Sequence, residues 1–159
     1  MSDSEVLEGS EAPFAPSVDW WEMDPADRVD TLGELRIFVA RLVTAYGHQM
    51  TGAIPACWEQ HEGAVRLLDA LHRSYLVATH PAQVGEALIG WHHNLTYIRS
   101  ELQTLFGMEA CTDDHHAPMS VPQWAADIDA DGKESQTWQA RQAEALAAYE
   151  REVAARAGA

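Results

Sequence analysis

Two cysteine–histidine pairs are the residues of this sequence best suited to chemistry, because both pairs have the same four-residue spacing. Cys57 precedes His61, and Cys111 precedes His115, with His116 directly after it. Residues at positions i and i+4 share one face of a helix. Two thiolates and two imidazoles form a donor set that zinc accepts as a closed tetrahedron. The spacing therefore predicts one zinc site, with Cys57, His61, Cys111 and either His115 or His116 as ligands.

The sequence leaves two other interpretations of the cysteines open. A disulfide between Cys57 and Cys111 requires the same proximity as a shared metal. The two cysteines can also be unrelated buried residues, with the histidines at the surface. In the cytosol, such a set is more often a metal site than a disulfide. His92, which follows Trp91, is a candidate additional ligand or a hydrogen-bond partner of a ligand, and its alternative role is a boundary histidine bonded to a backbone carbonyl.

Three amphipathic helices are predicted to bring the two pairs together. The first begins at Asp24-Pro25, an N-cap followed by proline, and ends at Gly47. The second begins at Pro55 and breaks at His80-Pro81, and the third ends at Gly107. A short turn joins the second helix to the third, so the two should be antiparallel, with the start of one beside the end of the other. Apolar residues recur at three- and four-residue steps in each helix, namely Leu32, Leu35, Val39, Leu42 and Tyr46, then Ala64, Leu68, Leu71 and Tyr75, then Val84, Leu88, Trp91, Leu95, Ile98, Leu102 and Leu105.

The whole chain is predicted to be all-α, since no segment alternates apolar and polar residues with period two. Residues 1–17 are acidic and poor in apolar side chains, which predicts a disordered tail. Residues 18–118 are expected to form a helical domain with the zinc site. Residues 119–159 are expected to hold a linker, an Asp-rich turn and a C-terminal helix over 134–157 that lies across the bundle edge or projects. The predicted fold is a small antiparallel three-helix core with an additional C-terminal helix.

The Asp-rich turn resembles a calcium loop without completing one. Asp127, Asp129 and Asp131, followed by Gly132, match its first, third, fifth and sixth positions. The twelfth position requires a bidentate glutamate, and Trp138 stands there. The pattern is therefore interpreted as a turn before the last helix, and calcium is not an expected cofactor. No phosphate loop, nucleophile elbow or His-Glu-x-x-His motif is present, so no catalytic residues are assigned.

Charge and length restrict the possible partners. The 159 residues include 25 Asp and Glu against 10 Lys and Arg, a formal charge of −15. This balance argues against direct nucleic-acid binding and against anionic membrane surfaces, since both require clustered basic residues. No apolar run approaches the roughly 18 residues of a transmembrane helix, and the N-terminus has no basic and apolar signal segment. We therefore expect a cytoplasmic protein.

Two adjacent tryptophans, Trp20 and Trp21, follow the acidic tail and are candidate partner-binding residues. Their alternative role is to pack on the helices of the domain itself. The favoured hypothesis is a non-enzymatic, zinc-stabilised interaction module whose acidic charge suits a basic protein partner. One alternative is a small zinc-dependent enzyme, which would need an open ligand position for water. Another is an acidic mimic of nucleic acid, which would need carboxylates along one face.

The middle of the chain, roughly residues 18–117, resembles a family of small actinobacterial proteins met on conjugative plasmids, integrative elements and phages. The resemblance implies a mobile-element context and brings no settled biochemical activity. Its spacing after the last cysteine favours His116 over His115, and the chain departs from its pattern at Ala56, where a second proline is typical. The resemblance depends on the order of short motifs, namely Val18-Asp19-Trp20-Trp21, Ile54-Pro55-Ala56-Cys57-Trp58-Glu59-Gln60-His61, Leu68-Asp69-Ala70-Leu71, Trp91-His92, Arg99 and Cys111 with His116.

Overall fold

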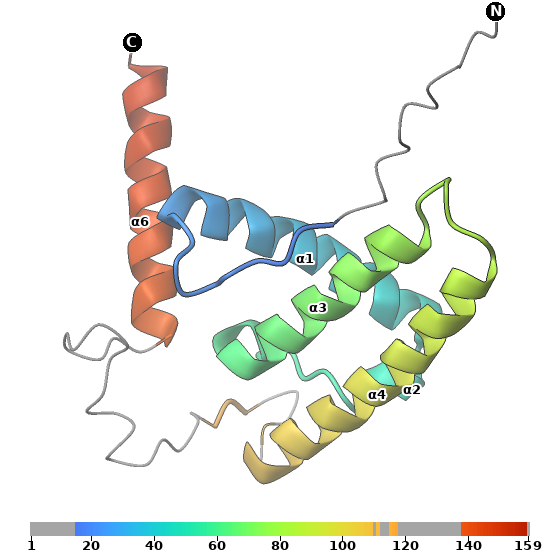
Figure 1. Cartoon of the computed structure of the whole chain (residues 1–159). Helices are drawn as coiled ribbons and strands as arrows, with labels where there is room; N and C mark the ends of the chain where they lie inside the picture. The colour runs from blue at the N-terminus through green and yellow to red at the C-terminus, as the bar shows by residue number, and fades with distance from the viewer. Residues whose placement is uncertain (1–14, 110, 112–114, 118–137, 159) are drawn as a thin grey trace, which may run out of the picture.

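The computed structural model describes residues 15–109, 111, 115–117 and 138–158 (Figure 1). All regular elements within these ranges are helices, which confirms the all-α prediction. None of the helices in this described part is long and apolar enough to cross a membrane. In chain order the elements are α1 (Pro25–Tyr46), α2 (His48–Thr51), the 3₁₀ helix η1 (Trp58–Gln60), α3 (Glu62–Ala78), α4 (Glu86–Glu109) and α6 (Trp138–Ala157).

Helix α1 has the two ends that its sequence predicts. The Asp24 carboxylate accepts a hydrogen bond from the Ala26 N–H at 2.9 Å, so one of the N–H groups left over at the helix start has a partner. At the other end, Gly47 has φ of +53°, a backbone conformation that residues with a Cβ atom rarely adopt. Local capping chemistry therefore sets both bounds of this helix.

The second predicted helix does not begin at Pro55. Turns with i to i+3 hydrogen bonds occupy this stretch, including the bonds from Trp58 N–H to Pro55 O and from His61 N–H to Trp58 O. His61 itself is extended, and α3 begins only at Glu62. A 3₁₀ turn places residues three apart on the same side. Trp58 and His61 are both buried, at 7% and 1% exposure, which this geometry allows.

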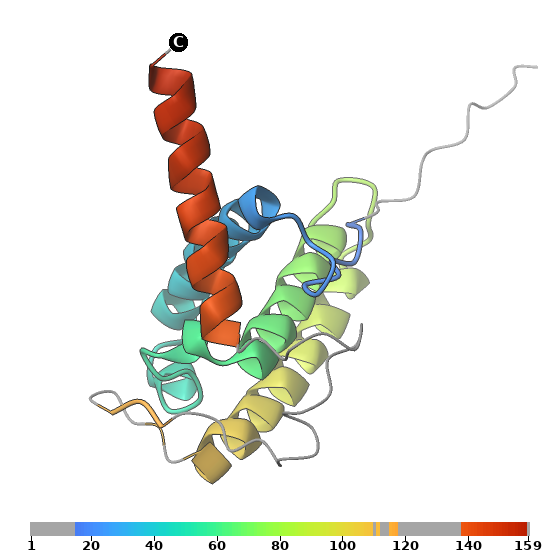
Figure 2. The same ribbon diagram turned by 90° about the vertical axis from the view of Figure 1, so that its left-hand side faces the viewer.

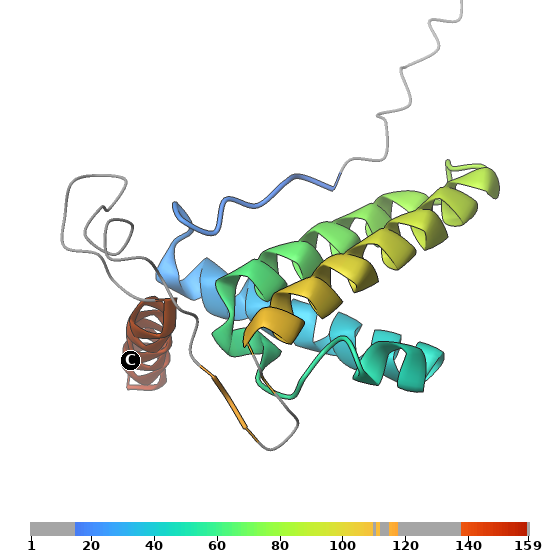
Figure 3. The ribbon, with the colours of Figure 1, turned by 90° about the horizontal axis from the view of Figure 1, so that it is seen from below.

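Helices α3 and α4 form the predicted antiparallel hairpin, and α1 crosses it (Figures 1 and 3). The indole N–H of Trp91 on α4 donates to the Leu71 carbonyl of α3 at 3.2 Å, which fixes the register between the two helices. The prediction that Gly107 ends the third helix is wrong, because α4 continues to Glu109. A glycine ends a helix when it takes a positive φ, and within the described residues only Gly47 does so.

Helix α6 packs against the bundle with its first half and projects from it with its second half (Figures 1 and 2). Its first half lies against the start of α1, where Trp138 and Ala145 are buried, and its second half extends away from the bundle (Figures 1 and 2). Residues 150–158 are all exposed. Trp138 belongs to the same apolar core as the α1, α3 and α4 residues. The C-terminal helix therefore shares a core with the domain predicted for residues 18–118.

The segment before α1 is held by buried polar contacts. Asp69 on α3 accepts hydrogen bonds from the Trp20 indole N–H at 3.2 Å and from Arg73 at 3.1 Å. The Arg28 guanidinium donates to the Trp20 carbonyl and lies over the Trp138 ring at 5.3 Å. Asp69 and Arg28 are each 4% exposed; Asp69 forms an ion pair with Arg73, whereas Arg28 is held by the Trp20 carbonyl and the Trp138 ring.

Candidate metal centre

Four of the five predicted ligands lie together at one end of the α3–α4 hairpin. One donor atom from each of Cys57, His61, Cys111 and His116 lies within 4.8 Å of the other three. The Nε2 atom of His61 is 3.3 Å from the Cys111 sulfur and 3.6 Å from the Cys57 sulfur. The four side chains could therefore hold one metal ion between them.

These distances fit a small tetrahedral ion. Zinc bonds of about 2.0 Å to nitrogen and 2.3 Å to sulfur place neighbouring ligand atoms about 3.3–3.8 Å apart. Two of the separations at His61 already have these values. The widest separation, up to 4.8 Å, would have to close by about 1 Å on binding. The cluster thus needs a small inward movement to meet the ion, without a change of fold.

The hairpin explains why residues 50 positions apart meet. His61 stands directly before α3, and Cys111 follows the end of α4 at Glu109. The His61 ring packs edge-on against Phe106 of α4, with ring centres 5.1 Å apart. The start of α3 and the end of α4 are therefore neighbours, as the sequence predicts. Cys57 and His61 do not share a helix, however, and η1 between them brings their donor atoms together.

The Cys111 sulfur contacts the backbone of Ala117. The Ala117 N–H lies 3.4 Å from this sulfur and the Ala117 carbonyl oxygen 3.5 Å from it, so the segment after α4 folds back around Cys111. No disulfide joins Cys57 to Cys111 in the structure. The Nδ1 atom of His116 is buried and has no hydrogen-bond partner among the described residues. A buried nitrogen of this kind is costly unless it is satisfied, and a metal ion at the cluster could satisfy it.

The structure distinguishes the two neighbouring histidines. His116 is half-buried and its ring centre is 4.9 Å from that of His61, whereas His115 is exposed and outside the cluster. His92 is also outside it. His92 lies fourteen residues before Phe106 on α4, about 20 Å along the helix axis. Its ring Nδ1 is 2.7 Å from the Leu88 carbonyl oxygen. This is the alternative role given above, a boundary histidine bonded to a backbone carbonyl.

Two braces of the η1 turn were not predicted from the sequence. Arg36 of α1 pairs with Glu59 at 2.5 Å, and this hydrogen bond raises the pKa of Arg36. The indole N–H of Trp138 donates to the Glu59 backbone carbonyl at 2.9 Å. Glu59 stands midway between Cys57 and His61, so α1 and α6 both support the turn that carries these ligands. No local signal in the sequence reveals contacts between residues so far apart.

The two tryptophans have different surroundings. Trp20 is 1% exposed and packs against Trp138 with ring centres 5.8 Å apart, so its ring is not offered to a partner. Trp21 is 60% exposed, and the Arg66 guanidinium lies 3.7 Å from its ring centre. Of the two tryptophans predicted to bind a partner, only Trp21 is therefore accessible to one. The calcium-loop candidates Asp127, Asp129 and Asp131 lie outside the described residues, as do residues 1–14 of the predicted tail.

No protein-family model, curated protein or solved structure matches this chain. The resemblance to mobile-element proteins therefore stays a prediction, resting on the quoted motifs. The fold and the clustering of the four candidate ligands are observed in the geometry of the chain itself.

Proposed function

We propose that this protein is a non-enzymatic helical interaction module in which a structural zinc ion holds the segment after α4 against η1. The single observation that carries the proposal is the set of two sulfur and two nitrogen donors within 4.8 Å. Sulfur and imidazole together suit zinc, whereas calcium and magnesium prefer oxygen ligands.

A structural role for the ion follows from the number of ligands. Four protein donors complete the tetrahedron of zinc and leave no position for a water molecule. Zinc enzymes of the hydrolytic kind keep that position open, because the bound water is the nucleophile. The four-ligand set therefore supports the structural role over the alternative of a small zinc enzyme. Zinc that binds only the folded chain would add its binding free energy to folding.

Metal analysis of the full-length protein, purified without added metal or chelator, tests the zinc proposal. We expect one equivalent of zinc in the wild type and much less in Cys57→Ser. His115→Gln is the matched control, because His115 is an exposed neighbour outside the cluster and the variant should keep its zinc. Cobalt in place of zinc should give the visible absorption of a tetrahedral thiolate site. A protein that is folded and metal-free, and whose melting temperature a chelator leaves unchanged, would contradict the proposal.

The surface around Trp21 is the part of the module that we assign to a protein partner. Trp21 is a large exposed ring, stacked on Arg66, and Glu22 beside it is exposed. Exposed tryptophans are frequent anchors of protein interfaces. The formal charge of −15 would attract a basic partner and speed the encounter. A partner that itself handles nucleic acid would suit this charge and the mobile-element context of the resemblance.

Affinity capture from the native host tests the partner assignment. Tyr97→Ala is the matched control for Trp21→Ala, because Tyr97 on α4 is a ring of similar exposure, 62% against 60%. We expect the wild type and Tyr97→Ala to retain the same basic protein and Trp21→Ala to lose it, with equal melting temperatures. A partner retained equally by all three proteins would place the interface elsewhere, and the absence of any partner would remove the interaction role while leaving the zinc proposal intact.

A further inference from the structure

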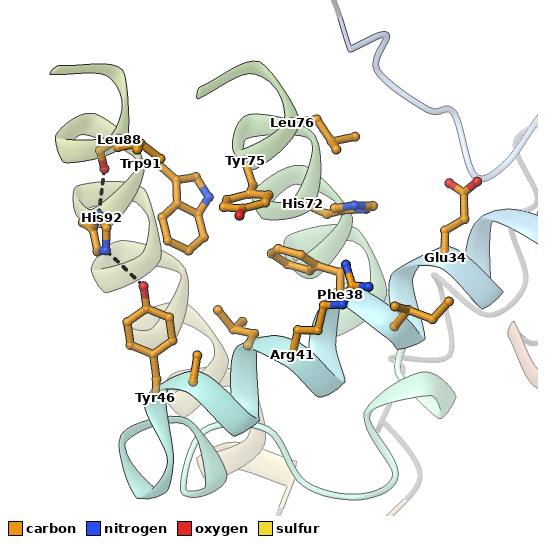
Figure 4. A pocket seen from close by; sticks show the side chains of 13 residues that line it. Glu34, Phe38, Arg41, Tyr46, His72, Tyr75, Leu76, Leu88, Trp91 and His92 are labelled. Atoms are coloured by element: carbon orange, nitrogen blue, oxygen red, sulfur yellow. Dashed lines mark hydrogen bonds between the residues drawn. The ribbon is translucent and has the colours of Figure 1, made fainter. Parts of the chain in front are cut away.

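A cavity of about 740 Å³ opens between α1 and the α3–α4 hairpin (Figure 4). It is lined at its α3 wall by His72, Tyr75 and Leu76, which lie more than ten residues beyond His61, the residue directly before this helix. The cavity and the metal centre are therefore at opposite ends of the hairpin, about 16 Å apart along α3. Small-molecule sites typically have volumes of about 300–1,000 Å³ and mostly apolar walls.

The cavity is a pit with a buried base. Phe38, Leu42 and Trp91 line it and are 8%, 3% and 4% exposed. At its rim, Ile37 and Leu76 are 56% and 45% exposed. Three helices thus converge on a closed floor, and apolar side chains stand around the opening. Such a shape suits a compact molecule that enters between the helices.

The aromatic walls are held in place by the protein. Trp91 is anchored through its indole N–H to the Leu71 carbonyl, and Tyr75 meets the Trp91 ring edge-on with centres 5.1 Å apart. Phe38 is stacked on His72 at 4.6 Å. In Figure 4 these rings face one common space. Because the rings are already ordered, a flat ligand would lose little affinity to ordering them.

Tyr46, Trp91 and His92 of the cavity wall use their polar atoms in hydrogen bonds within the protein. The Nδ1 atom of His92 is 2.7 Å from the Leu88 carbonyl, which can only accept, so Nδ1 carries the hydrogen. In the neutral ring Nε2 is then an acceptor, and the Tyr46 hydroxyl 3.0 Å away donates to it. Burial lowers the pKa of His72, so this imidazole is neutral near pH 7 and adds no charge.

Arg41 is the arginine of the cavity lining, and its guanidinium has no hydrogen bond or ion pair within the described part of the chain. The Arg41 side chain rises from α1 beside Phe38, toward the rings (Figure 4). The acidic group of the lining, Glu34, lies two helical turns away, about 10 Å along the axis. A guanidinium beside aromatic rings is well suited to bind a carboxylate or sulfonate whose apolar body lies on those rings.

We propose that this cavity binds a flat, largely apolar small molecule that carries one anionic group. The rings of Phe38, Tyr75 and Trp91 contact its body, and the Arg41 guanidinium binds its anion. This site is independent of the metal centre and of the surface around Trp21.

A matched pair of fluorescent probes tests the proposal on the full-length, metal-loaded protein. 8-Anilinonaphthalene-1-sulfonate carries one anionic group, and N-phenyl-1-naphthylamine is its neutral counterpart. We expect both to bind the wild type, and Arg41→Gln to weaken the anionic probe about three- to tenfold while leaving the neutral probe within twofold. Arg151→Gln, an exposed arginine of α6 outside the cavity, is the control and should change neither. Ala45 of α1 also lines the cavity, so Ala45→Trp should occupy part of its space and weaken both probes.

Three outcomes would overturn the proposal. The first is that neither probe binds the folded wild type. The second is that both probes bind Arg41→Gln and Ala45→Trp as well as they bind the wild type, which would place them elsewhere. The third is that the protein dimerises and probe binding falls as protein concentration rises, which would make a second copy the occupant. Cooperative melting and near-ultraviolet circular dichroism of each variant separate cavity binding from the binding of these probes to loosened protein.

Discussion

The four ligand residues of the candidate metal centre are held by the fold to different degrees. His61 is 1% exposed, packs on Phe106 and is fixed between η1 and α3. Cys57 is carried by the same braced turn. Cys111 and His116 stand in the segment after α4, where Ala117 bonds back to the Cys111 sulfur. A metal ion would therefore join a rigid half-site on the hairpin to a half-site on the following segment.

At the level of single residues, we predict that His116→Ala weakens zinc binding about a hundredfold, while His115→Ala leaves it unchanged. Removing one of four ligands should cost about a quarter of the binding free energy of a structural zinc. Competition with a chromogenic chelator would measure both affinities. Little loss in either variant would mean that either histidine can serve as the fourth ligand, and a loss confined to His115→Ala would contradict the assignment of His116.

His72 predicts a pH dependence of stability that belongs to the cavity wall. Burial, the largest cause, holds the pKa of His72 in the folded protein below its ordinary value of 6.5. As pH falls below 6.5, the unfolded chain takes up a proton before the folded protein does, so stability is lost as pH falls and is fully retained above that value. Urea unfolding at pH 7 and pH 5 should show a larger loss for the wild type than for His72→Gln. Both proteins share the metal centre, so its own pH dependence cancels in the comparison.

At the level of elements, the sequence predicts best where local chemistry decides. The bounds of α1 follow from Asp24 and Gly47, and the antiparallel hairpin follows from apolar periodicity with a short turn. The conformation of the stretch before α3 could not be predicted from local sequence, because η1 depends on Trp58 being buried against the rest of the molecule. The proximity of Cys57, His61 and Cys111 was predictable from spacing and topology. The choice of His116 came from the resemblance, since His115 has the more regular spacing.

The cap of α1 provides a prediction at this scale. Asp24→Ala removes the carboxylate that bonds the Ala26 N–H and should destabilise the protein by about 1 kcal/mol. Asp27→Ala is the matched control, because Asp27 is an exposed acidic residue of the same first turn with no capping role. Chemical unfolding of the three proteins measures the difference. An equal loss in both variants would attribute the effect to helix-dipole charge and not to the cap.

For the whole molecule, long-range contacts join parts that the sequence presents as separate. Helix α6 has a thin apolar stripe, and its packing depends on Trp138, which meets Trp20 and Arg28 near the start of α1. Neither contact has a local signature, so the sequence leaves the position of α6 undecided between packing and projecting. The same Trp138 bonds the Glu59 carbonyl in the turn between two metal ligands. The C-terminal helix and the turn that carries two of the candidate ligands are thus in direct contact.

This connection predicts that α6 and the metal stabilise each other. Trp138→Phe keeps an aromatic ring but removes the N–H that bonds Glu59, and it should cost about 1 kcal/mol of stability because a part-buried hydrogen bond is lost. It should also weaken zinc binding a few-fold, since the η1 turn loses a brace. Trp21→Phe, the same substitution at an exposed ring, should change neither property.

Because coupling between two sites is reciprocal, zinc should in turn slow amide exchange in the first turns of α6 in the wild type and less so in Trp138→Phe. Hydrogen exchange measured by mass spectrometry, with and without zinc, makes this comparison. Identical exchange of α6 in both states would show that the Trp138–Glu59 contact carries no coupling between the helix and the metal centre.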